Sequence, residues 1–303
     1  MATFRLATFN CENLFARYQF KENFTGNPSQ GWSINETTFD ILDEPQKKVT
    51  GQAIREADAD ILCLQEVENL PTLERFASRY CAPQKYKHRL LIDSHDPRNI
   101  DVGVLSRFPI VSIRTHRDLR TPNNKAFLYS RDCLEVTFDV DGGREFTVYV
   151  NHLKSMMGGR AETHARRKEQ ADHVAGLVKS RWGAKLQGNF AVVGDLNDYI
   201  DPDTALDVLV KKPLVNIVDR LPKADQWTHY WAGGGEYRQL DYILLPGPLD
   251  KAQGNPVPGV VRKGLPWRAS DYTGPRFDDV GENEPKASDH CPLFVDLDTA
   301  NLL

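Results

Sequence analysis

Short groups of acidic, amide and imidazole side chains recur along this chain, and each closes or follows an apolar run that predicts a β-strand. They are Thr8-Phe9-Asn10, Gln65-Glu66-Val67, Asn151-His152-Leu153-Lys154, Gly194-Asp195-Leu196-Asn197-Asp198, Leu240-Asp241-Tyr242 and Ser288-Asp289-His290. Carboxylates hold a hard divalent cation, amides orient water and phosphate, and imidazoles exchange protons. The combination predicts metal-assisted attack of water on a phosphate ester.

Each group also has a simpler interpretation. A single Asn or Asp at a strand end is more often a turn or cap residue than a ligand. Asp289-His290 alone fits a loop acid beside a surface histidine. Because all six groups agree in residue type and in position at strand ends, we favour one shared site over six unrelated turns.

Composition restricts the class of protein. The chain has 303 residues, of which 40% are hydrophobic and 26% charged, so a sizeable core is expected. A net charge of −4 argues against broad attraction to nucleic acid, although a local basic rim and a bound cation can offset an acidic site. The five cysteines lack paired or zinc-type spacing, which indicates buried thiols in a reducing compartment. No run approaches about 20 apolar residues, so we expect no membrane span. The start lacks the pattern of a signal peptide, so we expect a cytoplasmic protein, or a secreted one if a leader was removed.

The pattern of apolar residues predicts the elements that position these groups. Strands are expected at about 3–10, 60–66, 87–92, 101–106, 110–115, 129–140, 145–151, 190–193, 239–245 and 291–297, and helices at 44–57, 70–80 and 161–182. Loop excursions are expected at about 18–43 and 246–285, and a hairpin turn at Asp141-Gly142-Gly143. Strand–helix alternation at both ends, with hairpins between, predicts an α/β (α+β) fold. We expect a four-layered sandwich of two packed mixed β-sheets flanked by helices, forming a single domain over 1–303.

With these residues, the chain resembles the endonuclease/exonuclease/phosphatase superfamily, which includes the pancreatic-type deoxyribonucleases. The resemblance runs from Thr8 to His290, and Arg160-Ala161-Glu162-Thr163-His164 looks like the bacterial deoxyribonuclease-like branch. It implies that the metal, Mg²⁺ or Mn²⁺, lies at Asn10, Glu66 and Asp289. It implies that the catalytic residues are His152, Asp195, Asn197, Asp241 and His290. It also implies that Asp241 pairs with His290, that Asp101 orients His152, and that Glu12 is a second acidic group.

The chemistry of these side chains agrees with that implication. A phosphodiester is anionic and repels hydroxide, so a cation on its non-bridging oxygen stabilises the transition state. Glu66 supplies charge to hold the cation, and Asp195 can direct or take the proton of the attacking water. An imidazolium at His290, kept protonated by Asp241, can hydrogen-bond the phosphate. His152 can do the same or protonate the leaving oxygen.

Basic residues follow His152 in the sequence. The segment from Lys154 to Lys168 fits a solvated helix face or a rim that contacts flanking phosphates. The candidate substrate-binding residues are Asn151, Arg131, Lys154, Arg160 and Arg166, although Arg131 equally suits a structural ion pair. Trp32, Trp227, Tyr230, Trp231 and Tyr237 suit either core packing or stacking on a substrate. We interpret His95, His116, His164, His173 and His229 as mostly surface residues.

The first hypothesis is a metal-dependent phosphodiesterase that cleaves DNA or RNA as an endonuclease, with no obligate protein partner. The alternative keeps the chemistry but changes the substrate to a phospholipid, an inositol phosphate or a small phosphodiester. A catalytically inactive binding module is disfavoured, because every expected catalytic residue type is present. A basic track several phosphates long favours a polymer, whereas the net acidity favours a small substrate.

Overall fold

Two six-stranded mixed β-sheets form the centre of the protein, for which a computed structural model describes residues 2–20, 37–41 and 44–303. In the first sheet β1 and β4 pair in parallel and the other neighbours pair antiparallel. Its order is β15 (Gly259–Val260), β16 (Leu293–Asp298), β1 (Thr3–Leu14), β4 (Ile61–Val67), β6 (Asp101–Ser106) and β5 (His88–Leu91).

The second sheet has the same mixed character. Here β9 and β10 pair in parallel, and the other neighbours pair antiparallel. Its order is β11 (Leu214–Asn216), β14 (Asp241–Pro246), β10 (Phe190–Asp195), β9 (Glu145–His152), β8 (Cys133–Asp139) and β7 (Ile110–Arg114). The tight turn after Asp139 joins β8 to β9, which confirms the predicted hairpin.

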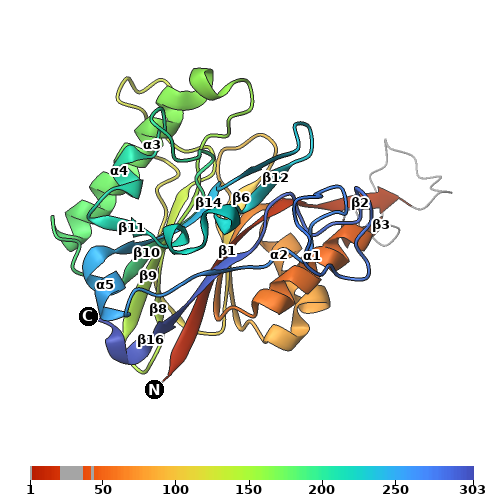
Figure 1. Ribbon diagram of the computed structural model, residues 1–303, viewed down its shortest axis with the longest axis horizontal. Coiled ribbons are helices and arrows are strands. Elements are labelled where there is room, and N and C mark those ends of the chain that lie inside the picture. Colours follow the sequence, from red (N-terminus) through yellow and green to blue (C-terminus); the bar gives the residue numbers. More distant parts are fainter. Residues whose placement is uncertain (1, 21–36, 42–43) are drawn as a thin grey trace, which may run out of the picture.

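Helices cover the outer face of each sheet, and the result is four layers (Figure 1). A core of buried side chains from both sheets, including Phe4, Val136, Val193 and Ile243, fills the space between them. The first sheet packs its other face on α1 (Glu44–Ala57) and α2 (Leu70–Tyr80), and the second on α3 (Arg160–Trp182) and α4 (Asp207–Val210). The predicted four-layered sandwich is confirmed. That these layers form one domain stays our interpretation.

Local sequence explains the helices that cover the first sheet. In α2 the side chain of Asn69 caps the N-terminus by accepting a hydrogen bond from the Thr72 amide, and Pro71 occupies the first turn, where it removes no helical bond. Leu73, Phe76 and Tyr80 recur at helical spacing and are buried. The bounds of both α1 and α2 are those predicted from the sequence.

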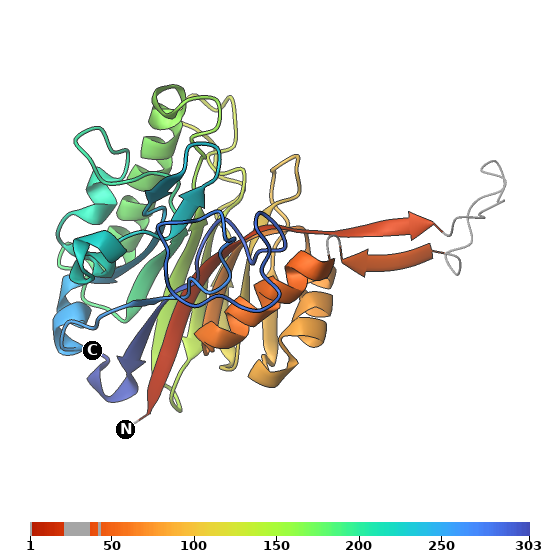
Figure 2. The ribbon, with the colours of Figure 1, turned by 45° about the vertical axis from the view of Figure 1, so that its right-hand side comes forward.

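The excursions contain short elements. Strands β2 (Ala16–Phe20) and β3 (Thr37–Ile41) pair antiparallel and project from the body of the protein (Figure 2), and residues 21–36 and 42–43 of the expected excursion lie outside the described residues. The excursion after β14 begins with α5 (Gly247–Ala252) and includes β15. A hairpin of β12 (His229–Trp231) and β13 (Glu236–Arg238) was not predicted. In the part of the chain that the structure describes, the 3₁₀ helices are η3 (Ala82–Gln84), η4 (Ile217–Arg220), η5 (Lys223–Asp225) and η6 (Thr299–Asn301).

Two strand boundaries differ from the prediction by four residues, and the others by at most two. Strand β8 begins at Cys133, not at Tyr129, because Asp132 has φ +51° and its carboxylate accepts hydrogen bonds from the His116 and Cys133 amides. Strand β1 continues past Asn10 through a register shift to Leu14. All five cysteines are free and buried, as predicted. Among the described residues, no helix is long and apolar enough to cross a bilayer.

Gly194 is needed where β10 approaches β9. Its φ is +130°, and a Cβ at this position would lie 1.9 Å from the carbonyl oxygen of Asn151. We expect Gly194→Ala to lower the free energy of unfolding by more than about 2 kcal/mol, because both the backbone and the neighbouring strand must shift. Urea denaturation measures this. Gly176→Ala, in α3 with open space around it, is the matched control and should leave stability equal or slightly higher.

Candidate active site

The sheet topology brings the predicted groups to one place. Strands β1 and β4 run in parallel with Asn10 beside Gln65, so Asn10 and Glu66 lie at the same edge of the first sheet. In the second sheet Asp195 of β10 lies beside His152 of β9 on one side and beside Asp241 of β14 on the other. His290 precedes β16, whose first residue, Leu293, pairs with Thr8 of β1. These edges meet, and we call the resulting set the carboxylate–imidazole cluster: Asn10, Glu66, His152, Asp195, Asn197, Asp241 and His290.

Asp195 lies at the centre of this cluster and is 1% exposed. Its Oδ2 accepts hydrogen bonds from Nδ2 of Asn10 at 3.1 Å and Nδ2 of Asn197 at 3.0 Å, and its Oδ1 accepts one from the Asn197 amide at 2.8 Å. Burial, with a further contribution from the Asp241 carboxylate, raises the pKa of Asp195 to about 7, although the charge of His290 acts in the opposite direction. A carboxylate in this condition exchanges a proton readily near neutral pH.

His290 is oriented and charged by its neighbours. Its Nδ1 lies 2.8 Å from Oδ2 of Asp241, which also accepts a hydrogen bond from Thr228 Oγ1 at 2.7 Å. Burial alone would lower the pKa of His290, but the Asp241 and Asp195 carboxylates raise it well above the usual value. Because Nδ1 is held by Asp241, the opposite ring nitrogen, Nε2, faces Asp195 at 3.8 Å from its Oδ2. The expected pairing of Asp241 with His290 is present.

His152 has the opposite electrostatics. Burial lowers the pKa of His152 well below its usual value, and the positive charges of Arg131 and His290 lower it further. Its Nε2 lies 3.5 Å from Asp195 and 3.8 Å from Glu66, while Nδ1 is buried without a hydrogen-bond partner in the described part of the chain. The Asp101 carboxylate accepts its hydrogen bond from the Ser94 amide instead. The expectation that Asp101 orients His152 is therefore wrong.

The three predicted metal residues lie around this centre. Glu66 has φ +62°, and its Oε2 accepts a hydrogen bond from the Asn13 amide. Asn10 directs its amide nitrogen at Glu66 and Asp195, while its Oδ1 accepts from the Glu12 amide. Burial would raise the pKa of Asp289, but the nearby His229 ring and the charge of His290 hold it well below its usual value. The metal role of all three stays a prediction.

Nearby polar residues complete the environment of Asp289. His229, which the sequence led us to place on the surface, is half-buried, and its ring centroid lies 4.6 Å from that of His290. Its Nε2 lies 3.6 Å from Asp289, so the surface interpretation of His229 is wrong. Glu12 accepts from the Asp289 amide and pairs with Lys286 at 2.6 Å. The surface interpretation is also wrong for His116, which is largely buried beside Glu135.

The predicted substrate-binding residues separate into two sets. Arg131 and Lys154 lie next to the carboxylate–imidazole cluster, where Arg131 donates to the Leu153 carbonyl and Asn197 Nδ2 donates to the same oxygen. Arg166 pairs with Glu169 at 3.0 Å. Arg160 is engaged with Asp198 and Asp201, and Asn151 donates to the Tyr149 carbonyl. The assignment of these five residues to substrate stays a prediction.

The aromatic residues serve mainly as packing. Tyr237 contacts both Trp227 and Tyr230, and Tyr230 packs with buried Leu265 and Cys291. Trp231 is 54% exposed and lines a pocket together with Glu12 and Asp289. Trp32 lies outside the described residues.

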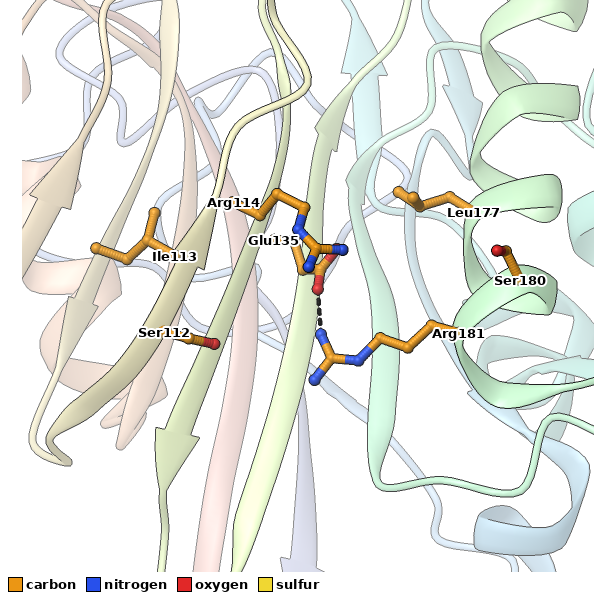
Figure 3. A pocket seen from close by; sticks show the side chains of 7 residues that line it. All are labelled: Ser112, Ile113, Arg114, Glu135, Leu177, Ser180 and Arg181. Carbon is orange, nitrogen blue, oxygen red and sulfur yellow. Dashed lines mark hydrogen bonds and ion pairs between the residues drawn. The ribbon is translucent and has the colours of Figure 1, made fainter.

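A separate polar hollow lies between β7, β8 and α3 (Figure 3). Arg114 and Arg181 approach the buried Glu135 carboxylate from the strand and the helix, and they compensate its charge. None of its lining residues belongs to the carboxylate–imidazole cluster. Its charged groups are paired with one another, so it offers no chemistry comparable to that at Asp195.

Comparison with known proteins identifies the class. The sequence model of the endonuclease/exonuclease/phosphatase family matches residues 5–220, and the chain belongs to this family. It is accordingly a hydrolase of the phosphoesterase class. No curated protein sequence matches the chain significantly.

Solved structures share the fold at low sequence identity. The human nocturnin catalytic domain, solved with a bound sulfate anion, is 17% identical, with a TM-score of 0.61 over 98% of this chain and 94% of that one. A truncated TDP2 from Caenorhabditis elegans is 15% identical, with a TM-score of 0.60 over 97% of each chain. An endonuclease/exonuclease/phosphatase from Beutenbergia cavernae is 18% identical, with a TM-score of 0.62 over 97% of this chain and 71% of that one.

Proposed function

We propose that this protein is a divalent-metal-dependent phosphodiesterase that cleaves DNA or RNA internally by in-line attack of water. The observation that carries the proposal is the carboxylate–imidazole cluster itself. The buried Asp195 carboxylate, whose pKa is raised to about 7, has two imidazoles within 4 Å of its Oδ2: His290, whose pKa is raised, and His152, whose pKa is lowered. Such opposed protonation states are what proton transfer and anion stabilisation require.

The donors present suit a hard cation. Glu66 is a carboxylate of the cluster, Asp289 is a carboxylate next to it, and Asn10 places an amide between Glu66 and Asp195. Oxygen donors of this kind bind Mg²⁺ or Mn²⁺, and rotation of the Asn10 amide would present its oxygen. The strained backbone of Glu66, with φ +62°, is typical of a residue held in place for function. When bound, the cation would neutralise charge on the phosphate and stabilise the transition state.

The side chains of this chain then have distinct tasks. Asp195, held by Asn10 and Asn197, receives the proton of the attacking water. His290 donates from Nε2 to a phosphate oxygen and brings positive charge to it, while Asp241 keeps its ring oriented. The bond from phosphorus to the leaving oxygen breaks opposite the attacking water, and that oxygen takes a proton from solvent. His152, a neutral imidazole whose Nε2 faces the carboxylates, supplies a hydrogen bond and no charge.

Support for an anionic substrate comes from the surroundings of the cluster. Arg131 and Lys154 bring positive charge next to Leu153, immediately after His152. The related fold of human nocturnin was solved with a sulfate anion, which has the shape and charge of a phosphate group. A nucleic acid strand presents such groups in series, which suits positive side chains beyond the reacting phosphate.

Removal of the cation is expected to abolish cleavage. Supercoiled plasmid incubated with the protein and Mg²⁺ or Mn²⁺ should be nicked, and EDTA should stop nicking because the phosphate charge is then uncompensated. Agarose gel electrophoresis measures the relaxed product. His290→Ala, assayed in parallel, controls for a contaminating nuclease and should lose the activity.

The same experiment tests the alternative substrate class. Intact plasmid combined with metal-dependent hydrolysis of bis-p-nitrophenyl phosphate would contradict a nuclease and favour a lipid, inositol-phosphate or small-diester substrate. The net charge of −4 is the feature that supports this alternative. Nicking that persists in EDTA would contradict the metal-dependent mechanism.

A further inference from the structure

A pocket of about 450 Å³ opens beside the carboxylate–imidazole cluster, and we call it the basic pocket. Its charged lining residues are Asp96, Arg98, Arg131, Lys154 and Arg166. Arg98 and Asp96 come from the segment between β5 and β6, Arg131 precedes β8, and Lys154 follows β9. Cations from three separate segments, together with Arg166 of α3, therefore line one pocket.

The charges of the basic pocket do not cancel. Four cations face one carboxylate, that of Asp96, which lies 3.0 Å from Arg131 Nε and 3.3 Å from Arg98 Nε. Glu169, outside the lining, pairs with Arg166, and the balance is still positive. Partial burial, followed by the charges of Arg131 and Arg98, lowers the pKa of Lys154. Cations gathered against their mutual repulsion indicate a site for an anion.

Buried side chains hold the pocket in shape. Arg131 is 3% exposed and donates to the Leu153 carbonyl at 3.0 Å. Gln170, 2% exposed, accepts from the Lys154 amide at 2.8 Å and donates to the Leu128 carbonyl at 2.9 Å. A guanidinium fixed in this way presents its remaining N–H groups without the entropy loss of a mobile arginine. The pocket is thus preformed for a planar or tetrahedral oxyanion.

The basic pocket adjoins the reacting centre through one peptide group. The Leu153 carbonyl accepts from Asn197 of the carboxylate–imidazole cluster and from Arg131 of the pocket. His152 and Lys154 flank that residue in sequence. When one phosphate of a substrate reacts at Asp195, the adjacent phosphate can therefore reach the basic pocket.

We infer that the basic pocket is a second phosphate subsite, which holds the phosphate adjacent to the scissile one. This inference rests on the proposed function and narrows its substrate class to chains with at least two phosphates in series, as in a nucleic acid strand. It adds Arg98 to the substrate-binding residues. It leaves Arg160 out, because Asp198 and Asp201 engage that side chain.

The test compares two dinucleotides in one reaction with Mg²⁺. One is thymidylyl-thymidine with a single phosphodiester, and the other carries an additional phosphate at each end, so that either direction of binding can fill the pocket. We expect kcat/KM to be about tenfold higher for the phosphorylated dinucleotide, mainly through KM, as for one charge-assisted contact. Liquid chromatography of the products measures the ratio.

Variants of the basic pocket should reduce this preference. Arg98→Ala and Lys154→Met are expected to bring the ratio toward one, and Arg98→Lys should restore part of it. Raising salt from 50 to 200 mM should lower the preference about two- to threefold, as expected for one contacted phosphate on a single strand. Arg114→Ala removes an equal charge from the hollow of Figure 3 and should retain the full ratio.

The outcomes separate the subsite from the proposed function. Equal cleavage of both dinucleotides by the wild-type protein overturns the subsite and leaves the phosphodiesterase in place. Cleavage of plasmid but of neither dinucleotide also overturns it, because an added phosphate then confers no advantage. Failure to cleave any diester contradicts the proposed function itself. An equal loss with Arg114→Ala would show a general charge effect in place of a subsite.

Discussion

Asp195→Asn is expected to reduce kcat for phosphodiester cleavage by about 10³-fold, the range attributed to a positioned proton acceptor. An amide has nearly the same shape but cannot take a proton, and it removes the negative charge between His152 and His290. The hydrogen bonds of Asp195 with Asn10 and Asn197 would also be weakened. The substrate KM should change much less than kcat, because Asp195 is expected to act on the attacking water.

Initial rates at saturating oligonucleotide measure this effect, and circular dichroism verifies that the variant is folded. Asp118→Asn, with a side chain 69% exposed beside His95, makes the same chemical change on the surface and should retain activity. A loss of less than about tenfold in Asp195→Asn would contradict its role as proton acceptor. A rise in KM without a fall in kcat would assign Asp195 to substrate binding instead.

Most of the fold was predictable because apolar periodicity was unambiguous. The apolar pattern of the sequence predicted the bounds of α2, and the alternation before Asn10 predicted β1 as far as that residue. The candidate site was predictable for a related reason. Glu66, His152 and Asp195 each lie at the end of a predicted strand. Parallel strands place such residues at one edge of a sheet, as β1 with β4 and β9 with β10 do here.

The parts that sequence did not predict depend on contacts between distant segments. His229 belongs to a three-residue strand with no apolar pattern, and its proximity to His290 arises from a bridge between two loops. The Asp101 carboxylate is satisfied by Ser94, which no spacing reveals. The strand expected from Tyr129 starts later because Asp132 turns the backbone to bind the His116 amide.

Arg167 illustrates the same limit for charged residues. A basic run at the start of a helix fits a solvated face or a phosphate-binding rim, and both were considered from the sequence. The structure buries Arg167 completely, with Nε 3.1 Å from the equally buried Asp198. Only the fold places Asp198, which follows β10, beneath the first turns of α3.

Arg167→Ala is therefore expected to lower the free energy of unfolding by about 3 kcal/mol, because it leaves a buried carboxylate with one cation fewer. Arg160 still pairs with Asp198, which keeps the loss toward the lower end of the range for broken buried pairs. The guanidinium also donates to the Lys154 and Arg160 carbonyls, so its removal frees groups on both sides of the loop after His152. Urea denaturation measures the stability change.

Lys168→Ala is the matched control, because this neighbouring residue is 46% exposed and pairs with Asp172 one helical turn away. Its expected cost is about 0.5 kcal/mol or less. Similar losses in the two variants would contradict a structural role for the Arg167–Asp198 pair. Since Arg167 holds the Lys154 carbonyl, Arg167→Ala should also weaken the phosphate preference of the basic pocket, and it should do so more than it lowers kcat. A larger effect on the preference than on kcat is expected only if α3 positions the basic pocket and the strands position the reacting centre.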